Sequence, residues 1–286
     1  MRDFLSRLQN ESVKLSKSQR RLSDYITENY DKAAYMTAAK LAATVGVSES
    51  TVVRFADELG FDGYPEFSVY LKEIANRKLT SIQRIALSDE RIGNVSILDS
   101  VLSSDIDKIK RTIENIDRAA FDAAVDAICS ARSIYIIGVR SSSALAMFLG
   151  YYLNHICENV RQITAISGVE LLEQLIHASE GDVVFAISFP RYSKRIIRAV
   201  EYASKKGARI ISLTDGMESP LAPMSDVCLC AQSEMVSFAD SLTAPFSLLN
   251  ALIIAIGRKK KDSVSKIYGE LESIWEAHEV YDKTNE

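Results

Sequence analysis

Histidine, cysteine and long apolar runs are scarce in this chain of 286 residues. It has three His and four Cys, and Cys228 and Cys230 have no His or second Cys pair near them in the sequence, so we expect buried small apolar side chains there and no zinc site. Four cysteines in a chain of this length do not indicate a disulfide framework. The longest apolar run, 248–256, is shorter than the ~20 residues that cross a bilayer. With no signal-peptide pattern at the start, we expect a cytoplasmic protein without metal or cofactor.

A strong positive charge is also missing. The net charge is −4. Residues 1–78 carry 12 basic against 11 acidic side chains, a net of +1, and the rest carries 22 against 27, a net of −5. Such a weak asymmetry does not identify a nucleic-acid partner, because phosphate binding needs clustered Lys and Arg. Any prediction of DNA binding must therefore rest on a motif.

Two patterns of apolar residues divide the chain. Up to residue 78 the spacing is helical, with helices predicted at 16–30, from Thr37, from Ser48 and over 64–78. After residue 130, apolar β-branched runs alternate with helical segments, which is typical of a parallel sheet covered on both faces. The predicted strands are 133–139, 159–164, 182–188, 208–215 and 226–231; the helices between and after them are 142–157, 169–178, 193–206 and 238–260.

The predicted fold is therefore α + α/β, an all-helical domain followed by a five-stranded parallel α/β sandwich. We place the domains at 1–78, a helical linker at 79–118, the α/β domain at 119–262 and a C-terminal helix at 263–286. The linker contains a heptad-like series of Leu102, Ile106, Ile109, Ile113 and Ile116. This seam fits a helix packed on the following domain, and it also fits a contact in a dimer.

Residues 38–57, AAKLAATVGVSESTVVRFAD, have the spacing of a helix-turn-helix. Such a motif needs a tight turn, a small residue where the helices cross and apolar residues that fix their angle. Gly46 lies in the expected turn, Ala42 is small enough for close contact, and Ser48 is placed to cap the second helix. The inward positions are filled by Leu41, Val45, Val47, Val52 and Phe55.

The outer face of the second helix then predicts the DNA contacts. Arg54 is the best candidate for a bidentate contact to guanine, and Ser50 and Thr51 suit bases or phosphates. Asp57 and Glu58 count against tight binding because they repel phosphate. Basic residues of the first helix offer a clamp for the DNA backbone. The predicted DNA-binding residues are Lys17, Arg20, Arg21, Ser48, Glu49, Ser50, Thr51 and Arg54.

Two loops at the carboxyl ends of predicted strands are rich in hydroxyls and Arg. GVRSSSALA (138–146) follows the first strand and SFPRYSKR (188–195) follows the third. Hydroxyls, backbone N–H groups and a guanidinium at a helix N-terminus suit a phosphate-sized anion; the alternative is capping serines with solvated arginines. The predicted ligand-binding residues are Arg140, Ser141, Ser142, Ser143, Ser188, Arg191 and Ser193.

This order of parts resembles the RpiR family of bacterial regulators, in which a helix-turn-helix domain precedes a sugar isomerase (SIS) domain that binds phosphosugars. The resemblance spans nearly the whole chain and includes ELGFDGYPEF (58–67), 213–226 and 237–253. It implies a regulator of carbohydrate metabolism genes with DNA, a phosphosugar effector and a second copy of itself, as dimer or tetramer, for partners. Ser142, Ser188 and Ser193 match SIS loop positions, whereas Arg140 and Pro190-Arg191 depart from them. The ligand is therefore expected to be more acidic or bulkier than usual.

The alternative function is a phosphosugar isomerase with an accessory helical domain. Isomerisation needs a base that moves a proton between carbons. We predict structural roles for His155 and His177, late in helices, which leaves Glu170 and Glu173 as possible bases. Because a predicted DNA-binding domain precedes the α/β domain, a sensor without turnover is favoured. No residue is therefore predicted to be catalytic.

Overall fold

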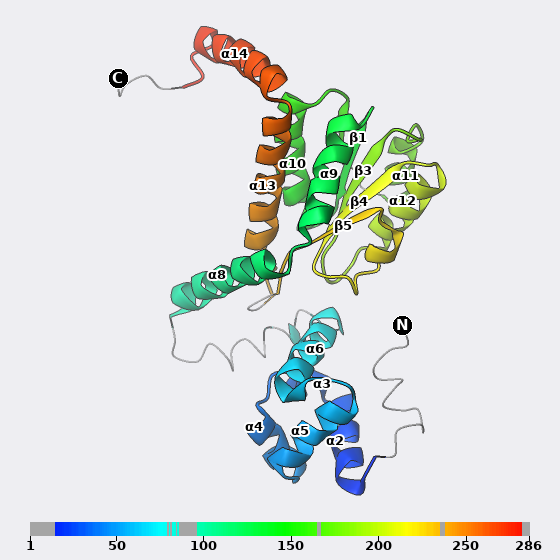
Figure 1. Ribbon diagram of the computed structural model, residues 1–286, viewed down its shortest axis with the longest axis vertical. Helices are drawn as coiled ribbons and strands as arrows, with labels where there is room; N and C mark the ends of the chain where they lie inside the picture. The colour runs from blue at the N-terminus through cyan, green and yellow to red at the C-terminus, as the bar shows by residue number, and fades with distance from the viewer. Residues whose placement is uncertain are drawn as a thin grey trace. The chain divides into compact units, whose positions relative to one another are not determined.

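The computed structural model describes residues 15–78, 80, 82–83, 85, 96–164, 167–234 and 238–281. The chain forms two compact units, Met1–Asn94 and Val95–Glu286 (Figure 1). Most of the predicted linker before Ser96 lies outside the described residues, as do residues 1–14 and the last five of the predicted C-terminal helix. The predicted fold class, a helical unit followed by a parallel α/β unit, is confirmed.

The first unit is a bundle of helices, each of which begins at a hydroxyl cap or follows closely on the preceding helix. Ser16 forms a capping box with Gln19, and Thr37 and Ser48 cap the two helices of the motif. A single core forms around the rings of Phe55 and Phe67. The described helices are α2 (Lys17–Glu28), α3 (Tyr30–Ala33), α4 (Ala38–Val45), α5 (Glu49–Glu58) and α6 (Gly63–Lys78).

The second unit is built on five parallel strands in the order β2-β1-β3-β4-β5. β1 (Ile134–Gly138) pairs on one side with β2 (Val160–Ile163) and on the other with β3 (Val183–Ile187), with Gly138 opposite Ile187. β4 (Arg209–Thr214) and β5 (Val227–Cys230) extend the sheet beyond β3. The residues of β3 are all buried, as expected for a central strand covered on both faces.

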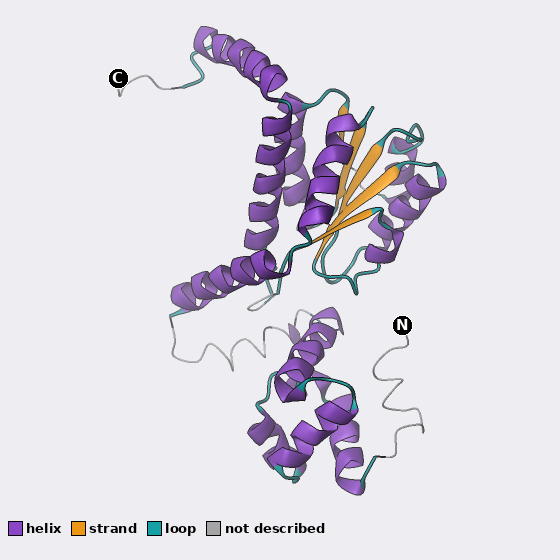
Figure 2. Ribbon diagram, viewed as in Figure 1, coloured by secondary structure: helices purple, strands orange, loops and turns teal. Residues whose placement is uncertain are grey.

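Helices cover both faces of this sheet (Figure 2). α9 (Arg118–Ser130), α10 (Ser142–Ile156) and α13 (Thr243–Lys259) pack in one core layer, and α11 (Gly168–Gln174) and α12 (Lys194–Lys205) pack in the other. A 3-10 turn, η1 (Ala222–Met224), precedes β5. α8 (Ile97–Asn115) packs against α13, and α14 (Lys261–Ala277) contacts α10 and α13.

The structure differs from the predicted elements at several positions. The helix expected at 238–260 begins at Thr243: Pro245 has no N–H to give a preceding turn, so it fits only the first turn of a helix. α9, capped by Asp117, and α3 were not predicted. His177 lies in the turn after α11 instead of within a helix.

Two further expectations concern the strand cysteines and the membrane. Cys228 and Cys230 share one face of β5 with their sulfurs 4.0 Å apart, but they are half-buried, so full burial as small apolar side chains was wrong. In the described part of the chain, no helix has both the length and the apolar character needed to span a bilayer.

Candidate functional site

The turn between α4 and α5 depends on Gly46. Its φ of 72° is left-handed, and its N–H donates to the carbonyl of Ala42 to close the helix. The Arg21 guanidinium donates to the carbonyl of Val45 at 2.5 Å, and a Cβ on Gly46 would lie 3.0 Å from the same nitrogen, Nη2. Arg21, predicted as part of the DNA clamp, thus fastens α2 to the turn.

The N-terminus of α5 presents a group of hydroxyls. The Ser48 Oγ lies 2.9 Å from that of Ser50 and 2.7 Å from the Thr51 Oγ1, and it accepts the Thr51 N–H at 3.2 Å. Ser48, Glu49, Ser50 and Arg54 are exposed, as are Lys17 and Arg20 on α2. These six polar residues therefore lie on the surface of the unit, where DNA contacts were expected.

The two acidic residues that counted against DNA binding have structural partners. The Asp57 carboxylate accepts the Gly63 N–H at 3.1 Å, where α6 begins. The Glu58 carboxylate accepts from the Gln19 side chain at 2.7 Å and so joins α5 to α2. Both lie at the C-terminal end of α5, away from the hydroxyls at its N-terminus.

The two loops that were predicted to bind an anion follow adjacent strands at the point where the strand order reverses. The chain passes from β1 to β2 on one side, and then from β3 to β4 and β5 on the other. The loops that follow β1 and β3 are therefore neighbours at the carboxyl edge, and open α/β sheets bind their ligands at this switch point. Gly138 permits the close approach of α10, because a Cβ there would lie 2.6 Å from the Ser142 carbonyl oxygen.

In the first loop, the hydroxyls point in different directions. Ser142 is buried in the first turn of α10, while Arg140 is exposed with a left-handed φ of 58°. Ser141 is the N-cap residue of α10 but makes no side-chain cap. Its hydroxyl donates instead to the Asp240 carboxylate at 2.7 Å, and the Ser143 hydroxyl donates to the Arg140 carbonyl at 2.6 Å.

In the second loop, two of the predicted residues bond to the loop itself. The Ser188 hydroxyl is buried and accepts the Ser193 N–H at 3.3 Å, and the Ser193 hydroxyl accepts the Arg195 N–H. Ser193 therefore caps α12. Arg191 is exposed.

Three residues of this edge were not predicted as site residues. The Tyr192 hydroxyl donates to the Asp215 carboxylate at 2.7 Å, and Asp240 accepts from Ser141. Asp215 directly follows β4, a position that the rule of polar residues at strand ends would have identified. Asp240 lies far from the loops in sequence, within a segment that was predicted to be helical. The resemblance includes 237–253, but neither spacing nor a position at a strand end singled out Asp240.

The possible bases for isomerisation have other surroundings. The Glu170 carboxylate accepts the Ser167 N–H at 3.4 Å within the capping box of α11, and Glu173 is exposed. His155 lies at the end of α10 against the ring of Tyr151, with centroids 4.8 Å apart, and its Nδ1 is buried without a partner among the described residues. No three His, Cys, Asp or Glu side chains come together as a metal site in the described ranges.

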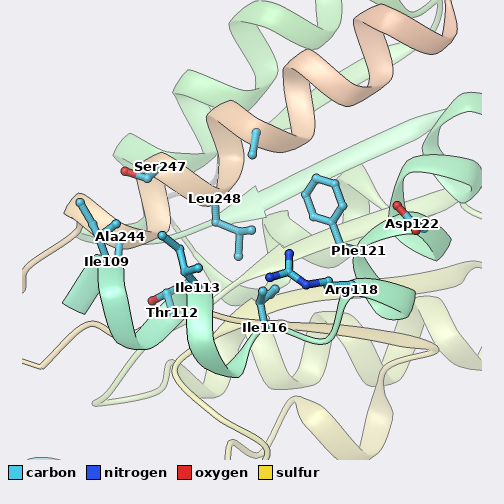
Figure 3. Close-up of a pocket in the computed structure, with 11 residues that line it drawn as sticks. Ile109, Thr112, Ile113, Ile116, Arg118, Phe121, Asp122, Ala244, Ser247 and Leu248 are labelled. Carbon is cyan, nitrogen blue, oxygen red and sulfur yellow. The ribbon is translucent and has the colours of Figure 1, made fainter. Parts of the chain in front are cut away.

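A separate apolar pocket of about 480 Å³ lies between α8, α9 and α13 (Figure 3). Ile109 and Ile113 of α8, and Ile116 directly after it, face Leu248 of α13 across the pocket, and Arg118 and Asp122 of α9 give it one polar end. The predicted seam of α8 is divided by this packing: Ile109 and Ile116 are partly covered, whereas Leu102, Ile106 and Ile113 are more than half exposed.

Two family models match the chain. Residues 2–78 match the helix-turn-helix domain of the rpiR family, and residues 127–255 match the SIS domain. An uncharacterised HTH-type transcriptional regulator of Clostridium perfringens is 31% identical over 225 residues, which cover 78% of this chain and 79% of the relative. The HTH-type transcriptional regulator HexR of Escherichia coli is 25% identical over 276 residues and 93% of each chain.

One solved structure aligns with this chain over almost the full length of both proteins. The NanR protein of Vibrio vulnificus complexed with ManNAc-6P is 27% identical, with a TM-score of 0.59 over 95% of this chain and 99% of that one. The likeness extends over the helical and the α/β unit.

Proposed function

The chain belongs to the RpiR family of helix-turn-helix transcriptional regulators, and we propose that its SIS domain binds a phosphorylated sugar or a related anionic metabolite as an effector that controls genes of carbohydrate metabolism. The observation that supports this most directly is the position of the two loops. Hydroxyls and Arg side chains from loops after β1 and β3 lie at the switch point of the sheet, each beside a helix N-terminus.

The phosphate-binding group consists of the predicted loop residues. Arg140 and Arg191 are exposed and bring two positive charges to the edge, and Ser142 and Ser188 are buried beneath it. Guanidinium groups form strong charge-assisted bonds with phosphate. The relative NanR is complexed with a sugar phosphate, which supports the same ligand class here. The two arginines favour a ligand that carries more negative charge than a simple hexose phosphate.

The DNA-reading surface that we propose is the N-terminal part of α5 with the start of α2. Arg54 reads a base, and Ser48, Glu49, Ser50 and Thr51 lie at the helix N-terminus that approaches the duplex. Lys17 and Arg20 contact the DNA backbone. Arg21 contributes mainly by holding the turn, through its bond to the Val45 carbonyl.

We further propose that the protein associates with itself through α8, which lies in the proposed helical linker of residues 79–118. Leu102, Ile106 and Ile113 leave apolar surface exposed on α8, and Ile113 also lines the apolar pocket of Figure 3. Two half-sites on DNA require a two-fold axis. Light scattering at micromolar concentration should give at least a dimeric mass; a monomer with DNA binding intact would refute this proposal.

The protein acts as a sensor without turnover. Glu170 is bonded in a helix cap, and His155 lies at the end of α10 opposite the loops. A thermal-shift screen of sugar phosphates tests the effector proposal, because a ligand of the native state raises the melting temperature. The expected result is a shift for one class of phosphosugars with no product formed. Conversion of the same compound into an isomer would favour the alternative function, a phosphosugar isomerase.

A further inference from the structure

Described residues on both sides of 235–237, between the end of β5 and the first residue of α13, are hydrogen-bonded to α8. On the α13 side, the Ser241 and Thr243 hydroxyls donate to the two oxygens of the Asp105 carboxylate at 2.6 and 2.8 Å. On the β5 side, the Gln232 N–H donates to the Thr112 hydroxyl at 3.0 Å. Asp105 and Thr112 both lie on α8, so a displacement of residues 238–243 acts directly on that helix through Asp105.

The Asp105 end of this connection is firmly held. The Lys108 ammonium is buried and donates to Asp105 at 3.2 Å and to the Ser104 hydroxyl at 2.7 Å. Burial opposes ionisation of Asp105, but the bonds from Ser241, Thr243 and Lys108 outweigh it and hold the pKa of Asp105 below its usual value. The carboxylate is therefore charged at neutral pH, and its bonds to the segment are charge-assisted.

The same segment contacts the effector loop. Asp240, one residue before Ser241, accepts the Ser141 hydroxyl at 2.7 Å. A serine hydroxyl has only one hydrogen to donate. A phosphate bound at the first loop and the Asp240 carboxylate therefore compete for that hydrogen, and two anions placed side by side repel one another.

We propose that Ser141 is the switch of this regulator: its hydroxyl hydrogen belongs to Asp240 in the free protein and to the phosphate in the bound protein. Loss of this bond, with the repulsion between Asp240 and the phosphate, shifts residues 238–243 and, through Asp105, shifts α8. Along the chain, α8 follows the helix-turn-helix unit, and we therefore take α8 as the helix whose shift changes DNA affinity. The inference rests on the proposed effector site and adds to it a competing residue and an output helix.

A ligand shifts an equilibrium between two states only if it binds one state more tightly than the other. The Ser141 hydroxyl provides this difference, because it is available to the phosphate in only one of the two states. A phosphate at the loop favours the state in which Asp240 has moved away, because only that state frees the Ser141 hydroxyl. Asp240 therefore opposes effector binding while it transmits the signal. If Asp240 only made a contact to the sugar, it would strengthen effector binding instead of opposing it.

The test uses the full chain, a DNA fragment that the wild-type protein selects from genomic DNA, and ManNAc-6P and inorganic phosphate as probes. Calorimetry gives probe affinity, and fluorescence anisotropy gives DNA affinity with and without probe. Asp240→Asn should bind the probe about three- to tenfold more tightly, since a neutral amide competes less well than a carboxylate. Its DNA affinity should respond less to the probe. Weaker probe binding by Asp240→Asn would overturn the proposal.

Asp105→Asn separates transmission from binding. Probe affinity should stay within about twofold of wild type, whereas the probe-induced change in DNA affinity and in hydrogen exchange of α8 should be lost. The matched control is Asp107→Asn, which removes the same charge from an exposed position two residues further along α8 and should respond as wild type does. Ser241→Ala provides a milder second variant, because it removes one of the bonds to Asp105.

The outcomes distinguish the two proposals. A wild-type protein that binds neither probe, nor any sugar phosphate of the thermal-shift screen, contradicts the effector site itself and, with it, the switch. A wild-type protein that binds a probe and changes its DNA affinity, with Asp105→Asn and Ser241→Ala responding equally well, leaves the effector site in place and overturns the switch.

Discussion

Substitution of Gly46 by Ala perturbs the turn between α4 and α5 in two ways. The φ of 72° is left-handed, and an L-residue there loses about 1–2 kcal/mol relative to a right-handed conformation. The added Cβ would also lie 3.0 Å from Nη2 of Arg21, which donates to the Val45 carbonyl. Relief of that contact moves the guanidinium and weakens its charge-assisted bond, which is worth about 1.5–3 kcal/mol when intact. Loss of about half of that bond, added to the conformational cost, predicts a total loss of about 2–3.5 kcal/mol in the helix-turn-helix unit.

Gly60 provides the matched control for this substitution. It has a φ of 89°, but a Cβ there meets nothing within 4 Å among the described residues. Gly60→Ala should therefore lose only the conformational term, about 1–2 kcal/mol. The entropy that Ala removes from the unfolded chain is common to both variants, so it cancels in the comparison.

Hydrogen exchange of the full chain, followed on peptides from residues 38–59, measures the stability of this unit separately from the SIS domain. Gly46→Ala should lower protection more than Gly60→Ala, and Arg21→Ala should reduce the difference when it is combined with Gly46→Ala. Equal losses in the two glycine variants would refute the role of Arg21, and an unchanged Gly46→Ala would refute the left-handed turn.

Further predictions concern DNA, effector and pH. Arg54→Ala should weaken specific DNA binding by ~1–3 kcal/mol and relax sequence preference, and unchanged operator affinity in this variant would contradict the orientation of α5. Lys17→Ala should weaken binding to all DNA sequences alike. In titrations over a salt series, it should lower by about one the slope of the logarithm of DNA affinity against the logarithm of salt concentration. Arg191→Ala should weaken effector binding in calorimetry more than Ser193→Ala, because a charge-assisted bond contributes about 1.5–3 kcal/mol and a neutral one about 0.5–1.5. The pKa of Asp105 is lowered, so its stabilising contribution should be constant at neutral pH and lost as the pH falls below about 4; a stability difference between wild type and Asp105→Asn that varies between pH 6 and 8 would contradict this.

Local signals made the helical unit predictable. Gly46, Ser48 and the apolar positions of residues 38–57 each specify a nearby feature of the chain, and the structure confirms the turn, the cap and the buried face. α3 escaped prediction because four residues are too few for a helical period to show. The bonds of Asp57 and Glu58 could not be predicted, since both partners belong to other helices.

In the α/β unit, too, local features could be predicted from the sequence and long-range contacts could not. Apolar runs predicted all five strands, but their order in the sheet is a long-range property that periodicity does not contain. The start of α13 was placed too early because apolar spacing was weighed above Pro245, which fixes the first turn. The bonds of Asp240 and Asp105 join segments about 100 residues or more apart, and only the structure reveals them.

The most direct test of a DNA-binding sensor is the retention of a selected genomic DNA fragment by the full chain, measured by fluorescence anisotropy while sugar phosphates are titrated. The expected result is sequence-specific retention that changes severalfold with one sugar phosphate, while chromatography of the same mixture shows that compound unchanged. DNA retention that stays the same with every sugar phosphate would contradict the proposed function. Steady conversion of the compound into an isomer would also contradict it.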